Sequence, residues 1–357
     1  MPHKGECRMP RFRVIAPAVV AVALAATFVR AQPRPDRVAL TVDPTEAQLV
    51  LGMLDQRAAG RLPADSDWAR LLASAPYRRL AERERSMGRA FDDGAFKTFV
   101  LSDSLLAART QLRRTLQAWM ARDLVPAAQG ILPYLPAEAR IRATVYPVIK
   151  PRTNSFVFDT KGNPAIFLYL DPAVPAPKYR NTVAHELHHI GFASVTRPEA
   201  AADSALAKGT RDALDWMSAF GEGFAMLAAA GGPRVHPHAT SLPADRQRWD
   251  ADMMHTDDDL AKVEAFLMDL IEGRIATEDE VNRRGMEFFG VQGPWYTLGY
   301  RMAATIERRY GRRVLIEAMR DPRVMVHRYN AAIAEENRRG AHHALWSARF
   351  VAAIGAG

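Results

Sequence analysis

Apolar residues follow a helical period over most of this chain and a strand-like pattern in one short region. Residues 43–123 are helical in pattern: one helix is predicted to open at Thr45, and another is capped by Ser102 or Asp103. The helical period returns after the strand-like region and is interrupted by a Gly/Pro-rich loop over 231–243. The expected later helices cover about 211–230, 255–273, 277–289, 295–310, 312–320, 323–338 and 341–353.

The strand-like region lies in the middle of the chain. Residues 141–149, 156–158 and 166–171 are short and rich in β-branched and aromatic residues, and a turn at 159–163 separates the last two. Three prolines then end the pattern before a helix begins near Tyr179. We therefore expect an α+β fold, mainly α, with a small antiparallel or mixed sheet directly before that helix and a helical C-terminal part.

The first 31 residues have the pattern of a secretory signal peptide. Basic residues from Lys4 to Arg13 precede an apolar run, Val14 to Val29, and Ala31 supplies a small residue before the expected cleavage point. The run is short and early for a membrane span, although an uncleaved anchor is an alternative. We expect a bacterial protein exported to the periplasm or secreted, without stable membrane insertion after cleavage.

Charge and cysteine content narrow the class further. The chain of 357 residues has a net charge of +8; the signal carries five basic residues and one acid, so the rest has +4. A charge of that size indicates no nucleic-acid partner. The one cysteine, Cys7, lies in the signal, so the mature chain is expected to lack disulfides and to depend on core burial.

The mature length suits one large domain or two smaller ones. We divide the chain into the signal peptide, 1–31, a helical region, 32–140, a core with the sheet and the two helices described next, 141–230, and a helical region that completes a cleft, 231–357.

An H-E-x-x-H motif within the predicted helix carries the most specific chemistry. His185 and His189 are four residues apart, so they project from one helix face and can bind one ion. Zn²⁺ suits these imidazoles, and Glu186 lies about 100° round the helix, where it can accept a proton from water. His188 lies off that face and is expected to support a ligand or lie at the surface. A di-iron carboxylate site would need a second Glu-x-x-His, which the sequence does not contain.

A catalytic zinc needs a third protein ligand and an open position. Glu222 is the best candidate, because Gly221 and Gly223 flank it on a predicted helix and allow close approach to a neighbouring helix. Glu199 and Asp203 follow the motif too closely, in a Pro/Ala-rich connector.

Four further histidines and two tyrosines are weaker candidates for the site. His236 and His238 lie in a Pro-rich loop, and His342 and His343 lie near a terminal helix, so exposed positions are expected for all four. Tyr296 and Tyr300 are spaced by four residues on a helix beginning near Pro294. Either phenol is a candidate to stabilise an oxyanion, and the alternative for both is amphipathic core packing.

The order of strand, H-E-x-x-H helix and later Gly-Glu-Gly helix resembles the gluzincin peptidases. Within them the chain is similar to a bacterial family of candidate zinc-dependent peptidases, over roughly 140–335. The matching segments are 185–189, 221–225 and 296–303. The resemblance implies a zincin-like fold, His185, His189 and Glu222 as zinc ligands, and Glu186 as the base. The chain departs from the pattern in one respect. Some gluzincins have an acidic residue shortly after the ligand glutamate, whereas residues 224–226 are apolar here, so the sequence does not identify the groups that orient the histidines.

The expected function is an exported zinc metallopeptidase acting on peptide or protein substrates, with the strand near 166–170 as a possible edge for β-addition. A zinc hydrolase of non-peptide amides or esters has the same site chemistry. A non-catalytic envelope protein with a structural zinc would need a fourth ligand. The sequence leaves substrate preference and oligomeric state open.

Overall fold

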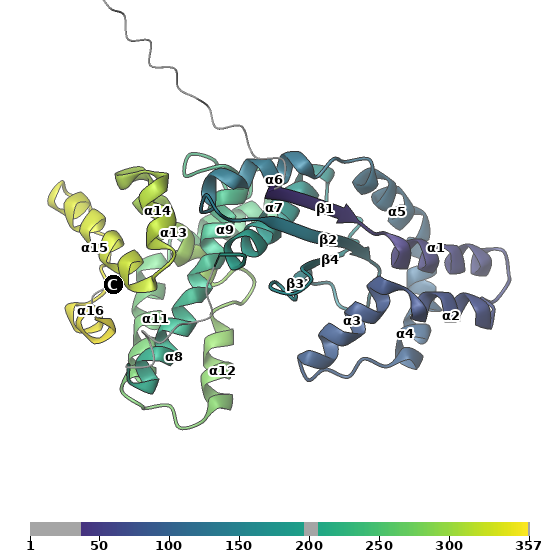
Figure 1. Ribbon diagram of the computed structural model, residues 1–357, viewed down its shortest axis with the longest axis horizontal. Coiled ribbons are helices and arrows are strands. Elements are labelled where there is room, and N and C mark those ends of the chain that lie inside the picture. Colours follow the sequence, from purple (N-terminus) through teal and green to yellow (C-terminus); the bar gives the residue numbers. More distant parts are fainter. Residues whose placement is uncertain (1–36, 196–205, 356–357) are drawn as a thin grey trace, which may run out of the picture. The chain divides into compact units, whose positions relative to one another are not determined.

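The computed structural model describes residues 37–195 and 206–355, which belong to one compact unit (Figure 1). The predicted signal peptide lies outside the described residues. Among those described, no helix is both long and apolar enough to cross a membrane.

A four-stranded mixed sheet forms the centre of the N-terminal half (Figure 1). The strands lie in the order β1 (Val38–Val42), β2 (Ile141–Val148), β4 (Ala165–Tyr169) and β3 (Phe156–Phe158), with β3 antiparallel to β4 and the other pairs parallel. With helices over most of the remaining described residues, this confirms the predicted α+β, mainly α, class. The sequence reading missed β1.

The two central strands, β2 and β4, are largely buried on both faces, whereas Ala39 and Thr41 of β1 are exposed. Val145 and Ile166 join the main core on one face, whereas Tyr146 and Phe167 join a smaller cluster with Leu80 on the other. The prediction of an open edge at β4 is wrong, because β4 lies between β2 and β3; β3 is the edge strand on that side.

The chain between β1 and β2 is mainly helical. The predicted cap of the long helix is confirmed, because the Ser102 hydroxyl accepts a hydrogen bond from the Leu105 amide. The helices are α1 (Thr45–Ala58), α2 (Asp65–Ala73), α3 (Ala75–Ser86), α4 (Asp93–Val100), α5 (Asp103–Met120), α6 (Val125–Ile131) and the 3₁₀ turn η2 (Leu132–Tyr134).

The remaining helices follow the sheet. They are α7 (Ala176–Ala193), α8 (Lys208–Met217), the 3₁₀ turn η4 (Ser218–Phe220), α9 (Gly221–Ala230), α10 (Pro243–Met253), α11 (Thr256–Ile271), α12 (Glu278–Glu287), α13 (Pro294–Tyr310), α14 (Arg312–Ala318), α15 (Pro322–Arg338) and α16 (Ala348–Ile354).

Three of these differ from the sequence expectation. The helix expected over 211–230 is broken by η4, and α10 was not predicted. The last helix begins at 348 rather than near 341, because the Ser347 hydroxyl caps it and Asn330 bonds the backbone of the buried Trp346 just before it.

Two glycines let the backbone of α13 touch the backbones of α9 and η4. A Cβ on Gly223 would lie 1.9 Å from the Tyr300 nitrogen, and one on Gly299 would lie 2.5 Å from the Phe220 carbonyl oxygen. Only glycine permits such an approach. The close contact at Gly223 is therefore between α9 and α13, not between α9 and α7, and it brings Tyr296 next to Glu222.

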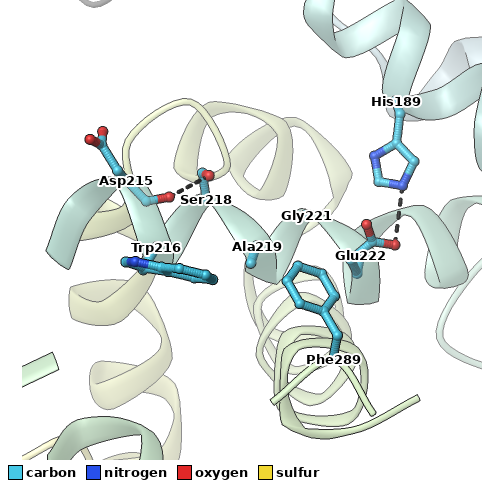
Figure 2. Close-up of a pocket in the computed structure, with 8 residues that line it drawn as sticks. All are labelled: His189, Asp215, Trp216, Ser218, Ala219, Gly221, Glu222 and Phe289. Atoms are coloured by element: carbon cyan, nitrogen blue, oxygen red, sulfur yellow. Dashed lines mark hydrogen bonds and ion pairs between the residues drawn. The ribbon is translucent and has the colours of Figure 1, made fainter. Parts of the chain in front are cut away.

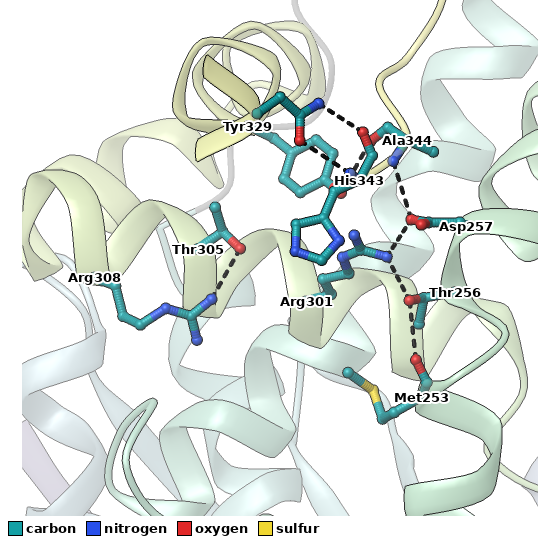
Figure 3. Close-up of polar contacts among 10 residues, drawn as sticks. Met253, Thr256, Asp257, Arg301, Thr305, Arg308, Tyr329, His343 and Ala344 are labelled. Carbon is teal, nitrogen blue, oxygen red and sulfur yellow. Dashed lines mark hydrogen bonds and ion pairs between the residues drawn. The ribbon is translucent and has the colours of Figure 1, made fainter. Parts of the chain in front are cut away.

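A polar network holds α13 from its outer side (Figure 3). The Arg301 guanidinium donates to Thr256 and to the Asp257 carboxylate in the first turn of α11. Asp257 also accepts from the Ala344 amide at 3.2 Å, and the Tyr329 hydroxyl donates to the Ala344 carbonyl at 3.4 Å. These bonds tie α13, α11 and α15 to the segment before α16.

Candidate metal centre

Two helices bring three donor atoms to one point. His185 and His189 lie one turn apart on α7, and Glu222 lies in the first turn of α9. The Glu222 Oε2 atom lies 3.1 Å from His185 Nε2 and 3.3 Å from His189 Nε2, and the two Nε2 atoms are 3.1 Å apart. Over residues 37–195 and 206–355, this is the one group of His, Cys, Asp and Glu arranged to hold a metal.

The donor set fits zinc in geometry and in chemistry. Two imidazoles and a carboxylate at bond lengths of about 2.0–2.2 Å round a tetrahedral ion are roughly 3.3 Å from one another. The three observed separations are close to that value. The His189 and Glu222 side chains keep 26% and 22% of their surface exposed, so solvent reaches the site.

The charges of these groups are coupled. Burial alone would lower the pKa of His189, but the Glu222 carboxylate, helped by Glu186, raises it to about 9. Burial alone would raise the pKa of Glu222, but His189 and His185 hold it well below its usual range. A carboxylate that stays ionised beside two imidazoles is suited to share a cation with them.

Glu186 stands next to this set without joining it. Burial raises its pKa, the two histidines oppose that shift, and the Glu222 charge adds to it. Because it follows His185 directly on α7, its carboxylate projects to one side of the three donors.

Of the two candidate tyrosines, Tyr296 lies at the site. Its ring is stacked 6.4 Å from that of His185, and its phenol faces Glu222; burial first, and then the Glu222 charge, raise its pKa. Tyr300 donates its hydroxyl to the Val235 carbonyl at 3.4 Å and packs its ring on Trp249. The contacts therefore favour Tyr296 as a catalytic candidate and a packing role for Tyr300.

His188 is a core residue, not a surface one. It is 2% exposed, and its ring packs edge-on against Phe224 at 4.5 Å. Burial lowers its pKa well below the usual value, while the Tyr134 backbone opposes part of that shift. Its contacts fasten α7 to α9 behind the donor atoms.

The other histidines lie away from the three donors. His236 and His238 were both expected to be exposed. His236 is only 21% exposed and lies 2.8 Å from Asp250. His238 is 2% exposed and bonds the Ser241 hydroxyl at 2.9 Å. Burial, helped by Lys178, lowers the pKa of His238 to about 4. His342 and His343 are exposed, as predicted. Glu199 and Asp203 lie outside the described residues.

A cavity of about 390 Å³ opens directly beside the donors (Figure 2). A larger hollow, of about 1110 Å³, shares His189, Ser218 and Gly221 with it and extends to the start of α15. The smaller cavity was not predicted from the sequence. The three-residue spacing of Trp216, Ala219 and Glu222 was the available indication, because residues so spaced lie on one side of a helix. It is lined by His189, Asp215, Trp216, Ser218, Ala219, Gly221, Glu222 and Phe289.

One comparison with known proteins gives a match. Neither the curated proteins nor the solved structures contain a match to the chain. Residues 68–338, which include all three donors, match one protein family. The match covers most of the chain and confirms the resemblance to zinc-dependent peptidases. The chain belongs to the family described as "Putative zinc dependent peptidase (DUF5700)".

Proposed function

We propose that the protein hydrolyses peptide bonds with His185, His189 and Glu222 as zinc ligands and Glu186 as general base. The observation that carries this proposal is the convergence of the three donor atoms within 3.3 Å of one another, with Glu186 next to them on α7. The family match supports it at the level of a zinc-dependent peptidase.

Each residue has a definite task. Zinc bound by such a set polarises a carbonyl group and lowers the pKa of water. Glu186 takes the proton from the attacking water and passes it to the departing amine. The Tyr296 phenol, which already faces Glu222, donates a hydrogen bond to the oxygen on which negative charge develops.

The shape of the site favours an extended substrate. The two cavities share His189, Asp215, Ser218 and Gly221, so together they form a continuous groove beside the donors. Thr160 and Lys161, directly after β3, line the larger hollow. The outer edge of β3 is therefore placed to align a peptide by β-addition. This edge replaces β4, the strand from which the sequence led us to expect β-addition.

Export remains part of the proposal. The basic and apolar pattern of residues 1–31 supports cleavage and release into the periplasm or the medium, with no nucleic-acid partner and no stable membrane insertion. Determining the N-terminal residue of protein recovered from the envelope and the medium of an expressing bacterium tests this. A start at Gln32 is expected, and a retained Met1 would refute cleavage.

Glu186→Gln tests the catalytic proposal most simply. The variant should keep zinc and lose about 10³-fold in turnover, because a positioned general base contributes about 10²–10⁴-fold. Casein and small esters are assayed side by side with wild type. Turnover of esters without casein would favour the alternative of a non-peptide hydrolase, and an active Glu186→Gln would refute the base assignment.

A further inference from the structure

The cavity of about 390 Å³ beside the donors has two aromatic residues, Trp216 and Phe289, in its wall. Trp216, Ala219 and Glu222 follow one another at three-residue spacing along α8, η4 and α9, and lead outward from the donor atoms (Figure 2). Phe289, from the segment after α12, lies against this row. The surface next to the donors is therefore mainly apolar and aromatic.

The aromatic wall is fixed in place before any ligand arrives. The Trp216 ring lies against Gly285, where a Cβ would come within 2.4 Å of it, and is stacked 6.2 Å from Trp295. Phe289 packs against Trp295 and, at 6.3 Å, against Tyr296. A wall that needs no reordering binds an apolar group at a lower entropic cost.

Charge does not dominate the cavity. The Asp215 carboxylate points away from Phe289 and Glu222 (Figure 2), and the Ser218 hydroxyl donates to the Asp215 backbone carbonyl at 2.5 Å. These two polar residues therefore do not offer a free anionic contact at the aromatic wall. The remaining carboxylate in the lining, Glu222, is one of the proposed zinc ligands.

The absence of a side chain at Gly221 leaves space in this cavity. It lines the cavity, a Cβ at its position would meet nothing within 4 Å, and its φ of −54° is ordinary helical backbone. Larger residues therefore fit at this position without backbone strain, and their side chains occupy the space of the cavity.

We propose that this cavity is a specificity pocket, which binds a bulky aromatic or long aliphatic side chain of a residue flanking the scissile bond. The proposal rests on the peptidase function above and adds its substrate class. The cavity volume lies within the roughly 300–1,000 Å³ of typical ligand pockets, so an alanine side chain would leave most of it without contacts.

The test compares wild type with Gly221→Val on a peptide library that varies both residues flanking the cleaved bond. Wild type should favour Phe, Tyr, Leu or Met over Ala by about tenfold or more at one of these positions. Gly221→Val should reduce that ratio to about one. Gly52→Val in α1, an exposed helical glycine with nothing within 4 Å, is the matched control and should keep the wild-type ratio.

A binding measurement separates this proposal from the catalytic one. Zinc-loaded Glu186→Gln is titrated calorimetrically with two peptides that differ only by Phe or Ala at the selected position. The Phe peptide should bind about tenfold more tightly, and adding Gly221→Val should remove the difference. Binding selectivity without wild-type turnover would refute the peptidase and keep the pocket. Turnover without selectivity, or selectivity unchanged by Gly221→Val, would refute the pocket.

Discussion

Two glutamates, Glu222 at the half-buried site and Glu46 in the core, behave in opposite ways in this protein. Glu222 faces two imidazoles at the rim of a cavity, and its pKa is held low. Glu46 on α1 is fully buried; one oxygen accepts from the Ile149 amide at 2.8 Å, and the other has no hydrogen-bond partner among the described residues. Burial raises its pKa to about 8, against the effects of that amide and Lys150.

The comparison shows what distinguishes a site from a buried charge. Burial acts in the same direction on both carboxyl groups, so it cannot by itself identify a functional residue. Glu222 differs because other donor atoms converge on the same point and because solvent reaches it. A variant of one glutamate therefore has the other glutamate as its natural control.

The largest effect is expected from Glu222→Ala. Loss of one of three ligands should weaken zinc binding by about 10³-fold, since even the partners of ligands contribute 10–100-fold, and turnover should fall with it. Zinc content after gel filtration and competition with a chelator measure this. Glu46→Gln should bind zinc like wild type, and an unchanged zinc affinity in Glu222→Ala would break the comparison.

Tyr296→Phe should give the next largest effect. Losing a hydrogen bond to the developing oxyanion should lower kcat by roughly 10–100-fold, with KM and zinc affinity nearly unchanged. Tyr300→Phe removes only a 3.4 Å bond to the Val235 carbonyl and should change kcat by less than about twofold. The reverse order of the two variants would show that the oxyanion donor has been assigned to the wrong tyrosine.

Glu46→Gln should affect stability and not catalysis. Its folded pKa of about 8 lies above the unfolded value of 4.5, so the native state binds more protons between these pH values and loses stability as pH rises. Between pH 5.5 and 7.5 the metal-free wild type should lose about 2 kcal/mol relative to Glu46→Gln, at roughly 1 kcal/mol per pH unit. Urea unfolding of both proteins in chelator measures it, with the exposed Glu82→Gln as control. Parallel curves for wild type and Glu46→Gln would exclude the effect.

The sequence predicts those parts of the site that depend on local geometry. His185 and His189 share a face because four residues return an α-helix to nearly the same direction. Glu222 was singled out through its glycine neighbours, yet Gly223 packs against α13, not α7. The structure does bring Glu222 to the histidines, but the close helix contact expected at its glycine neighbours is made with a different helix.

The rest depends on packing between distant segments. β1 pairs with a strand about 100 residues later, and the cavity joins Trp216 with Phe289, although helices α9 to α12 separate them in the sequence. Tyr296 and Tyr300 share a helix face, but α9 crosses α13 between them at Gly223, so one turns to Glu222 and the other to Val235. The periodicity of apolar residues in the sequence does not predict where two helices cross.

The central claim is that three side chains share one zinc ion. Crystals grown with zinc, with diffraction recorded on both sides of the zinc absorption edge, test it directly. The account predicts one strong anomalous peak about 2.0–2.2 Å from His185 Nε2, His189 Nε2 and a Glu222 oxygen. An ion held by other side chains, or no anomalous signal between α7 and α9, would contradict it.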